Sequence, residues 1–186
     1  MREALPRSNE TKPGPFVVIA ALVALASMLT AQAAAPLIEA QRQAMQKLAF
    51  LAGHWSGQVS IVRGPGEPLK ATQTEDVQYK LDGLVLLIEG KSTDGEGRQV
   101  FSALATISYD DVSKSYRFRA YNGGRYVDAE FDVPGNGFSW SYVGGPAHVV
   151  NTMHLTEKGQ WQESTEVEMG GSPPRKVVEM LLDKQP

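Results

Sequence analysis

Hydrophobic and polar residues alternate one by one through most of this chain, from Trp55 almost to the C-terminus. A period of two is typical of β-strands that bury one face. Short segments rich in Gly, Pro, Asn and Asp separate about ten such runs and favour turns. The predicted strands are Trp55–Arg63, Ala71–Leu81, Leu84–Ser92, Arg98–Tyr109, Tyr116–Tyr121, Arg125–Val133, Phe138–Val143, His148–Thr156, Trp161–Met169 and Lys176–Asp183.

The segments between these runs are too short for a parallel crossover, so consecutive strands are expected to pair antiparallel. No second helix is predicted that could cover an open sheet. The pattern therefore favours an all-β fold, a closed antiparallel up-and-down barrel of about ten strands, since closure removes exposed edges. A two-sheet sandwich is the structural alternative. A barrel of this size is wide enough to hold an internal cavity.

One helix is expected before the strands, from Pro36 to Leu51, because proline suits a first helical position and the period there is 3.6. Gly53 is expected to end it. The helix, within a segment 34–52, is predicted to dock on the barrel domain 53–186; a mobile helix is the alternative. Its apolar stripe consists of Ile38, Met45, Leu48 and Ala52.

The first 33 residues have the features of a signal peptide. Phe16–Leu29 is apolar and uncharged, and the small-x-small sequence Ala31-Gln32-Ala33 follows it. Cleavage after Ala33 would place the mature protein in the periplasm or outside the cell, without stable membrane insertion. An uncleaved anchor is the alternative, although the run is shorter than the roughly 20 residues of a spanning helix.

Composition narrows the partners and the chemistry. The chain has no cysteine, which excludes disulfides and a lipid-modified cysteine. Its net charge of −3 gives no electrostatic reason to expect nucleic acid as a partner. There is no Gly-x-Ser-x-Gly elbow, phosphate loop or dinucleotide fingerprint. A non-enzymatic role is therefore expected, with an enzyme of the barrel-isomerase or esterase kind as an alternative.

The segment Phe50–Gly57, which reads Phe-Leu-Ala-Gly-His-Trp-Ser-Gly, carries the most specific signal. Trp55 is predicted to plug the barrel floor. Gly53-His54-Trp55 resembles the Gly-x-Trp opening of calycins, the lipocalins and fatty-acid-binding proteins. From about Leu48 to Asp183 the chain is similar to a bacterial exported family of unknown function that opens with Phe-Leu-x-Gly-x-Trp. The resemblance implies a lipocalin-like barrel and no assigned reaction.

Haem is an alternative ligand, because nitrobindin-type barrels, which bind haem, share the Gly-x-Trp-x-Gly opening. Their axial histidine has no aligned residue in this chain. The three histidines, His54, His148 and His154, lack the spacing of a metal site, and no metal is expected. His154, beside Met153, is the candidate axial ligand.

Arg117 and Arg119 alternate with aromatic residues on one predicted strand. If they face inward, near Asp128, Glu130 or Glu163, they would clamp a carboxylate. If they face outward, the favoured arrangement, they form a ladder of surface ion pairs.

The leading hypothesis is an exported barrel that binds a small apolar or amphipathic molecule, with no cofactor. Haem binding is one alternative, and an envelope interaction module with a filled barrel is another. An exposed patch of Phe138, Trp140 and Tyr142 would favour the interaction module. The candidate ligand-binding residues are Trp55, Tyr79, Arg117, Arg119, Tyr121, Trp140 and His154.

Overall fold

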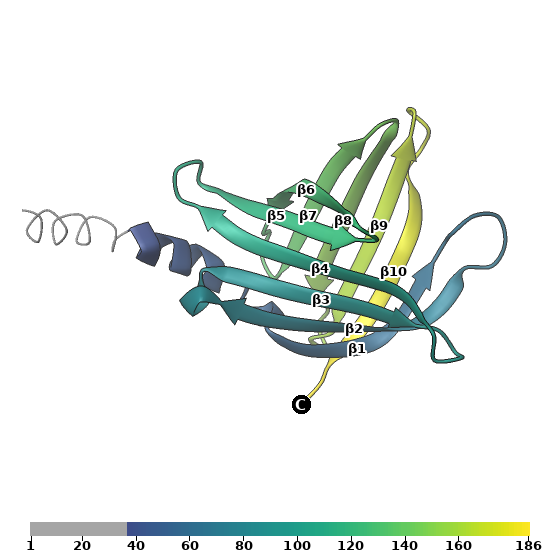
Figure 1. The fold of residues 1–186 in the computed structure, drawn as a ribbon, viewed down its shortest axis with the longest axis horizontal. Helices are drawn as coiled ribbons and strands as arrows, with labels where there is room; N and C mark the ends of the chain where they lie inside the picture. The colour runs from purple at the N-terminus through teal and green to yellow at the C-terminus, as the bar shows by residue number, and fades with distance from the viewer. Residues whose placement is uncertain (1–36) are drawn as a thin grey trace, which may run out of the picture. The chain divides into compact units, whose positions relative to one another are not determined.

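Ten antiparallel strands close into one barrel in the computed structural model, which describes residues 37–186 (Figure 1). Each strand pairs with the next along the chain, and β1 pairs with β10 to complete the cylinder. The predicted closed barrel is confirmed, and the two-sheet sandwich is wrong. The strands are β1 Gly53–Ile61, β2 Leu69–Lys80, β3 Val85–Thr93, β4 Gln99–Asp110, β5 Ser115–Asn122, β6 Arg125–Asp132, β7 Gly137–Gly144, β8 Ala147–Leu155, β9 Trp161–Met169 and β10 Arg175–Lys184.

The helix before the barrel is shorter than expected. Residues 37–46 are helical, a turn follows, and a 3-10 helix, η1, covers Ala49–Leu51. The N–H of Leu48 donates to the carbonyl of Met45, and this i to i+3 bond tightens the last turn. The tightening turns Leu51 into the core with Met45 and Leu48, while Ile38 stays 39% exposed. Of the predicted apolar stripe, Met45 and Leu48 are buried as expected, whereas Ile38 is not.

Four hydrogen bonds attach this helix to one end of the barrel. The hydroxyls of Tyr79 on β2 and Tyr116 on β5 donate to the carbonyls of Met45 and Ala44, at 2.6 and 2.8 Å. Arg42 donates to the Asp82 carbonyl in η2 (Leu81–Gly83), and Gln41 donates to Asp111. The two tyrosine bonds go to carbonyls in the last turn of the helix, where a helix C-terminus leaves such groups without an i+4 partner. The four bonds hold the helix against this end of the barrel, which we call its floor.

Trp55 closes that floor, as predicted. It is 2% exposed, and its indole Nε1 donates to the Leu51 carbonyl at 2.7 Å. The ring meets Trp161 edge to face, with centroids 5.6 Å apart. One aromatic residue thereby joins η1, β1 and β9.

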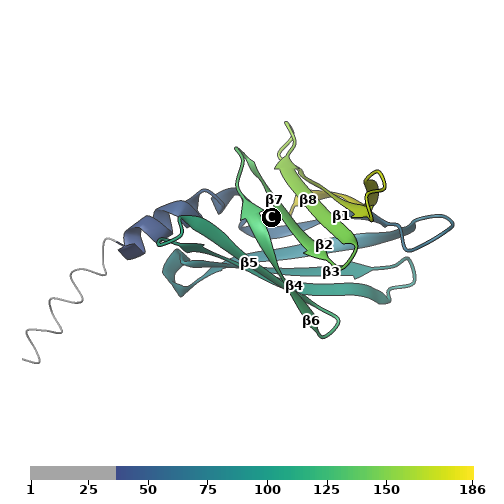
Figure 2. The same cartoon turned by 90° about the horizontal axis from the view of Figure 1, so that it is seen from above.

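The opposite end of the barrel, its mouth, is formed by the loops after β1, β3, β5, β7 and β9. Its wall has one short seam: β6 and β7 pair only at Glu130–Ser141, Phe131–Trp140 and Asp132–Ser139. Beyond these pairs the two strands diverge, as Figure 2 shows.

The predicted signal peptide and its predicted cleavage point lie outside the described residues. No helix within residues 37–186 has the length and apolar character needed to cross a membrane.

Candidate functional site

The inner wall of the barrel carries a continuous series of aromatic rings. Phe118 on β5 stacks against Phe131 on β6 and against Trp140 on β7, with centroids 5.4 and 5.6 Å apart. Tyr142 extends the series toward the mouth, 6.2 Å from Trp140. Because Trp140 and Tyr142 are only partly buried, they remain accessible from the interior. We call Phe118, Phe131, Trp140 and Tyr142 the aromatic wall.

This placement bears on one of the sequence alternatives. An exposed patch of Phe138, Trp140 and Tyr142 would have favoured an interaction module. Phe138 is instead 3% exposed, and all three residues lie on the inward parity of β7. The predicted alternation of β7 is present, and its aromatic residues are on the side that faces the lumen.

A polar cluster lies inside the barrel beside the aromatic wall. Asn151 on β8, directly paired with Trp140, donates through Nδ2 to Glu163 at 2.7 Å and to Thr165 at 2.9 Å. Trp161 Nε1 donates to the other Glu163 oxygen at 2.7 Å. On β2 and β3, Gln73 donates to Glu75 at 2.6 Å, and the Ser92 hydroxyl donates to Gln73. The interior polar cluster comprises Gln73, Glu75, Ser92, Asn151, Glu163 and Thr165.

Burial raises the pKa of both carboxyl groups of the cluster. Desolvation and the charge of Glu163 raise the pKa of Glu75 to about 8, against the opposing effect of the Gln73 hydrogen bond. Desolvation also raises the pKa of Glu163 to about 7, although Asn151 and Trp161 donate to it. Glu163 is enclosed by the barrel but keeps a partly exposed surface. The charge of Glu163 acts on Glu75, so the ionisation of Glu163 makes that of Glu75 less favourable.

Gly90 on β3 makes room for Glu75. A Cβ atom at Gly90 would lie 2.8 Å from both carboxylate oxygens of Glu75, closer than such atoms approach. The two residues are direct cross-strand partners. The small residue therefore belongs to the site, because any side chain there would displace the acid.

The carboxylate pair should make the protein less stable as the pH rises. An acid whose pKa is raised on folding holds its proton more tightly in the folded state, and unfolding releases that proton. Stability is therefore expected to fall between about pH 4.5 and about pH 8. Glu75→Gln should remove most of this decline and stabilise the protein by roughly 3 kcal/mol at pH 8.5. Urea unfolding at pH 5 and pH 8.5 measures the effect.

Glu89→Gln is the matched control, since Glu89 lies exposed on the outer face beside Gly90. It removes the same charge without changing the interior. Equal slopes of stability against pH for Glu75→Gln and the unaltered protein would contradict the assignment.

The arginines of β5 face outward, the arrangement favoured from sequence. Arg117 donates to Asp110 at 2.7 Å, and Arg119 donates to both oxygens of Asp128. These bonds hold the pKa values of Asp110 and Asp128 below the usual range. The inward carboxylate clamp does not form, because Phe118 takes the inner face between the two arginines. Glu163, one expected partner, lies inside the barrel instead.

The other sequence candidates lie apart from the polar cluster. Tyr121 is exposed on the outer face, and Tyr79 bonds to the helix. His154 is exposed on β8, while its neighbour Met153 points inward at 1% exposure. A haem held in the lumen would need an inward axial ligand, and His154 has the opposite parity. Of the seven candidates, Trp55, Tyr79 and Trp140 have inward-facing positions, and Tyr79 lies at the floor beneath the helix.

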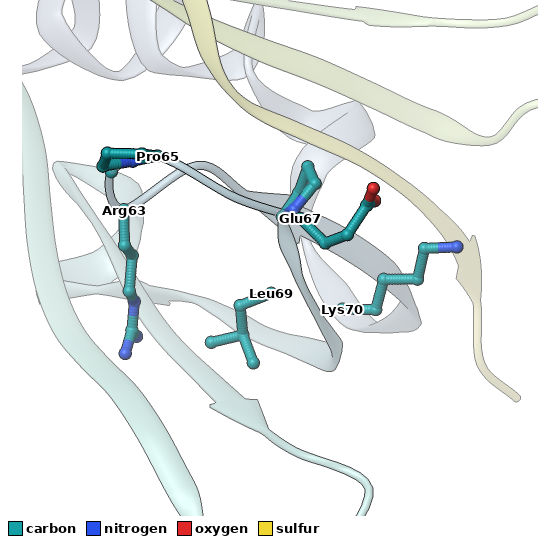
Figure 3. A pocket seen from close by; sticks show the side chains of 7 residues that line it. Arg63, Pro65, Glu67, Leu69 and Lys70 are labelled. Carbon is teal, nitrogen blue, oxygen red and sulfur yellow. The ribbon is translucent and has the colours of Figure 1, made fainter.

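Two surface hollows lie away from this interior. One, of about 770 Å³, is formed by the β1–β2 loop. Figure 3 shows that Arg63 points away from Glu67 and Lys70 there, so the charged groups do not converge. The other, of about 960 Å³, covers the outer face of β4–β6, where Arg119 is already paired with Asp128. Within residues 37–186, the buried polar side-chain atom that has no partner, Asn151 Oδ1, belongs to neither hollow.

Sequence reasoning missed the interior polar cluster, although the signal was present. Gln73 and Glu75 share the parity of Ala71 and Val77 on β2, so they must face the core. Asn151 likewise shares the parity of Val149 and Met153 on β8. Polar residues on the apolar parity of a strand mark an interior site.

Comparisons with known proteins show the fold and no more. A search with protein-family models finds no match to this chain, and a search of curated proteins finds none. Among solved structures, the chain is similar to the crystal structure of Rv2717c from M. tuberculosis, with a TM-score of 0.59 at 11% sequence identity. The alignment covers 77% of this chain and 98% of that chain. The class that this fold defines is a closed ten-stranded antiparallel β-barrel with a short N-terminal helix.

Proposed function

We propose that the protein is an exported, non-enzymatic barrel that binds a small amphipathic molecule in its interior. The supporting observation is the junction of the aromatic wall with the interior polar cluster, where Trp140 pairs directly with Asn151. Small-molecule sites combine mostly apolar walls with a few polar groups that fix orientation. The apolar leader at Phe16–Leu29 supports export to the periplasm or beyond.

Binding requires space along the inner wall, and small inward residues favour it. Ala105 on β4, Ala120 on β5 and Ala129 on β6 share the inward parity and are partly exposed. They lie beside and opposite the large rings of Phe118 and Phe131. The apolar part of a ligand would therefore lie against β4–β7, with its polar end at the Glu75–Glu163 side.

A neutral apolar dye tests whether the barrel interior binds a small molecule, and it does not require a polar head group on that molecule. N-phenyl-1-naphthylamine should bind saturably at one site per chain, with a fluorescence increase. Ala120→Trp should weaken this binding by about tenfold or more, because the indole would occupy the lumen. Fluorescence titration of the full-length protein measures both.

The matched control is Thr152→Trp, which places the same indole on the outer face of β8, where Thr152 is exposed. It should bind the dye as the unaltered protein does. No saturable binding to the unaltered protein, or equal binding by Ala120→Trp, would reject an interior ligand site.

A further inference from the structure

When both carboxylates are ionised, the interior polar cluster has more hydrogen-bond acceptors than donors. Gln73 donates to one Glu75 oxygen, and Asn151 and Trp161 donate to the two Glu163 oxygens. Asn151 is only 1% exposed, and its Oδ1 atom has no hydrogen-bond partner within the described residues. Buried polar atoms in folded proteins are nearly always paired. The unpaired amide oxygen therefore points to a donor that binds there.

The cluster also lacks positive charge. Neither Glu75 nor Glu163 forms an ion pair with a lysine, arginine or histidine of residues 37–186. Two nearby carboxylates in a poorly solvated interior are unfavourable when both are ionised. A ligand that carries positive charge would relieve this repulsion, whereas a carboxylate ligand would increase it.

We propose that Glu75, Glu163 and Asn151 hold the ammonium head of an amphipathic amine, while its apolar part lies along the aromatic wall. An ammonium group has three donors and no acceptor, which complements two carboxylates and a free amide oxygen. Trp140 adds an aromatic face beside Asn151, and such faces attract cations. This inference rests on the proposed interior site and specifies its ligand class.

A bound metal ion is the competing cation. Oxygen ligands suit calcium, which takes six to eight of them. Residues 37–186 contain no group of three or more His, Cys, Asp or Glu side chains placed to hold a metal. Asn151 and Trp161 each donate to one Glu163 oxygen, and the lone pairs that remain suffice for hydrogen bonds but fall short of the six to eight ligands of calcium. The ammonium, which can share the acceptors through directional hydrogen bonds, fits this set better.

The test compares three probes with the same ten-carbon chain: decylamine, decanol and decanoate. Decylamine and decanoate are titrated below their micelle concentrations, and decanol below its solubility limit, into full-length protein at pH 7.5, with isothermal calorimetry as the readout. Decylamine should bind about tenfold more tightly than decanol, and decanoate should bind more weakly than decanol. Calcium chloride, titrated separately, should give no saturable heat.

Amino-acid substitutions test whether the two interior carboxylates cause the preference for decylamine over decanol. Glu75→Gln and Glu163→Gln should each reduce the preference for decylamine over decanol, while decanol binding persists. The outer-face variant Glu89→Gln should keep the full preference. Circular dichroism confirms that each variant is folded.

The outcomes separate the two hypotheses. If none of the three chain probes binds, the proposed interior function fails. Equal binding of decylamine and decanol, a preference that survives in both interior variants, or saturable calcium binding lost in them would overturn the ammonium site alone.

Discussion

Replacing Trp55 with alanine is expected to lower the free energy of unfolding by about 3–5 kcal/mol. The substitution removes a side chain that is 2% exposed, its contact with Trp161 and its hydrogen bond to the Leu51 carbonyl. The floor around η1 and β9 would be left with a cavity. Urea unfolding, followed by far-ultraviolet circular dichroism, measures the loss.

Trp140→Ala provides the matched control. The same truncation at a partly exposed position in the lumen should cost less, because water can already reach that ring. If both variants lose the same stability, Trp55 is not the particular support of the floor. Trp55→Phe is expected to be intermediate, since it keeps a ring but leaves the Leu51 carbonyl unpaired.

Gly57→Ala is expected to destabilise the protein by roughly 3 kcal/mol, a large effect for one added methyl group. The new Cβ atom would fall on the Leu181 carbonyl oxygen and lie 2.8 Å from the Leu182 Cα atom. Both obstacles belong to the backbone of β10, so no side-chain rotation relieves them. Because β1 and β10 form the closing pair of the barrel, the strands must separate locally. Thermal unfolding and soluble yield report the damage.

Gly95→Ala is the control for this substitution. A Cβ atom at Gly95 meets nothing within 4 Å, and the residue lies in the exposed segment between β3 and β4. Its stability should change by less than about 0.5 kcal/mol. A Gly57→Ala protein as stable as Gly95→Ala would show that β10 can move aside.

The fold was largely readable from the sequence because strand periodicity and turn chemistry agreed along the whole chain. All ten predicted strands exist, and their ends differ from the observed ones by one or two residues or not at all. The helix end was predicted less well. Its final turn depends on the tyrosine hydroxyls of β2 and β5, which come from residues far away in the sequence.

The candidate site was harder to predict, since it depends on pairs of residues across the lumen. Glu75 and Glu163 come from β2 and β9, and no local pattern links them. Alternation along a strand shows which of its side chains face the interior. It does not show which residues of different strands lie close together. Arg117 and Arg119 drew attention because they are charged and adjacent to aromatic residues, although their ion pairs are complete on the surface.

The short pairing of β6 with β7 has a consequence for how the interior exchanges its contents. A wall joined at three positions separates locally at a smaller free energy than one joined at nine, as β1 and β2 are. Parting of β6 from β7 would open a lateral passage directly beside Trp140, while Trp55 and the docked helix stay in place. A guest of the proposed interior site would therefore be expected to enter and leave through this side, while the contacts of the floor stay intact.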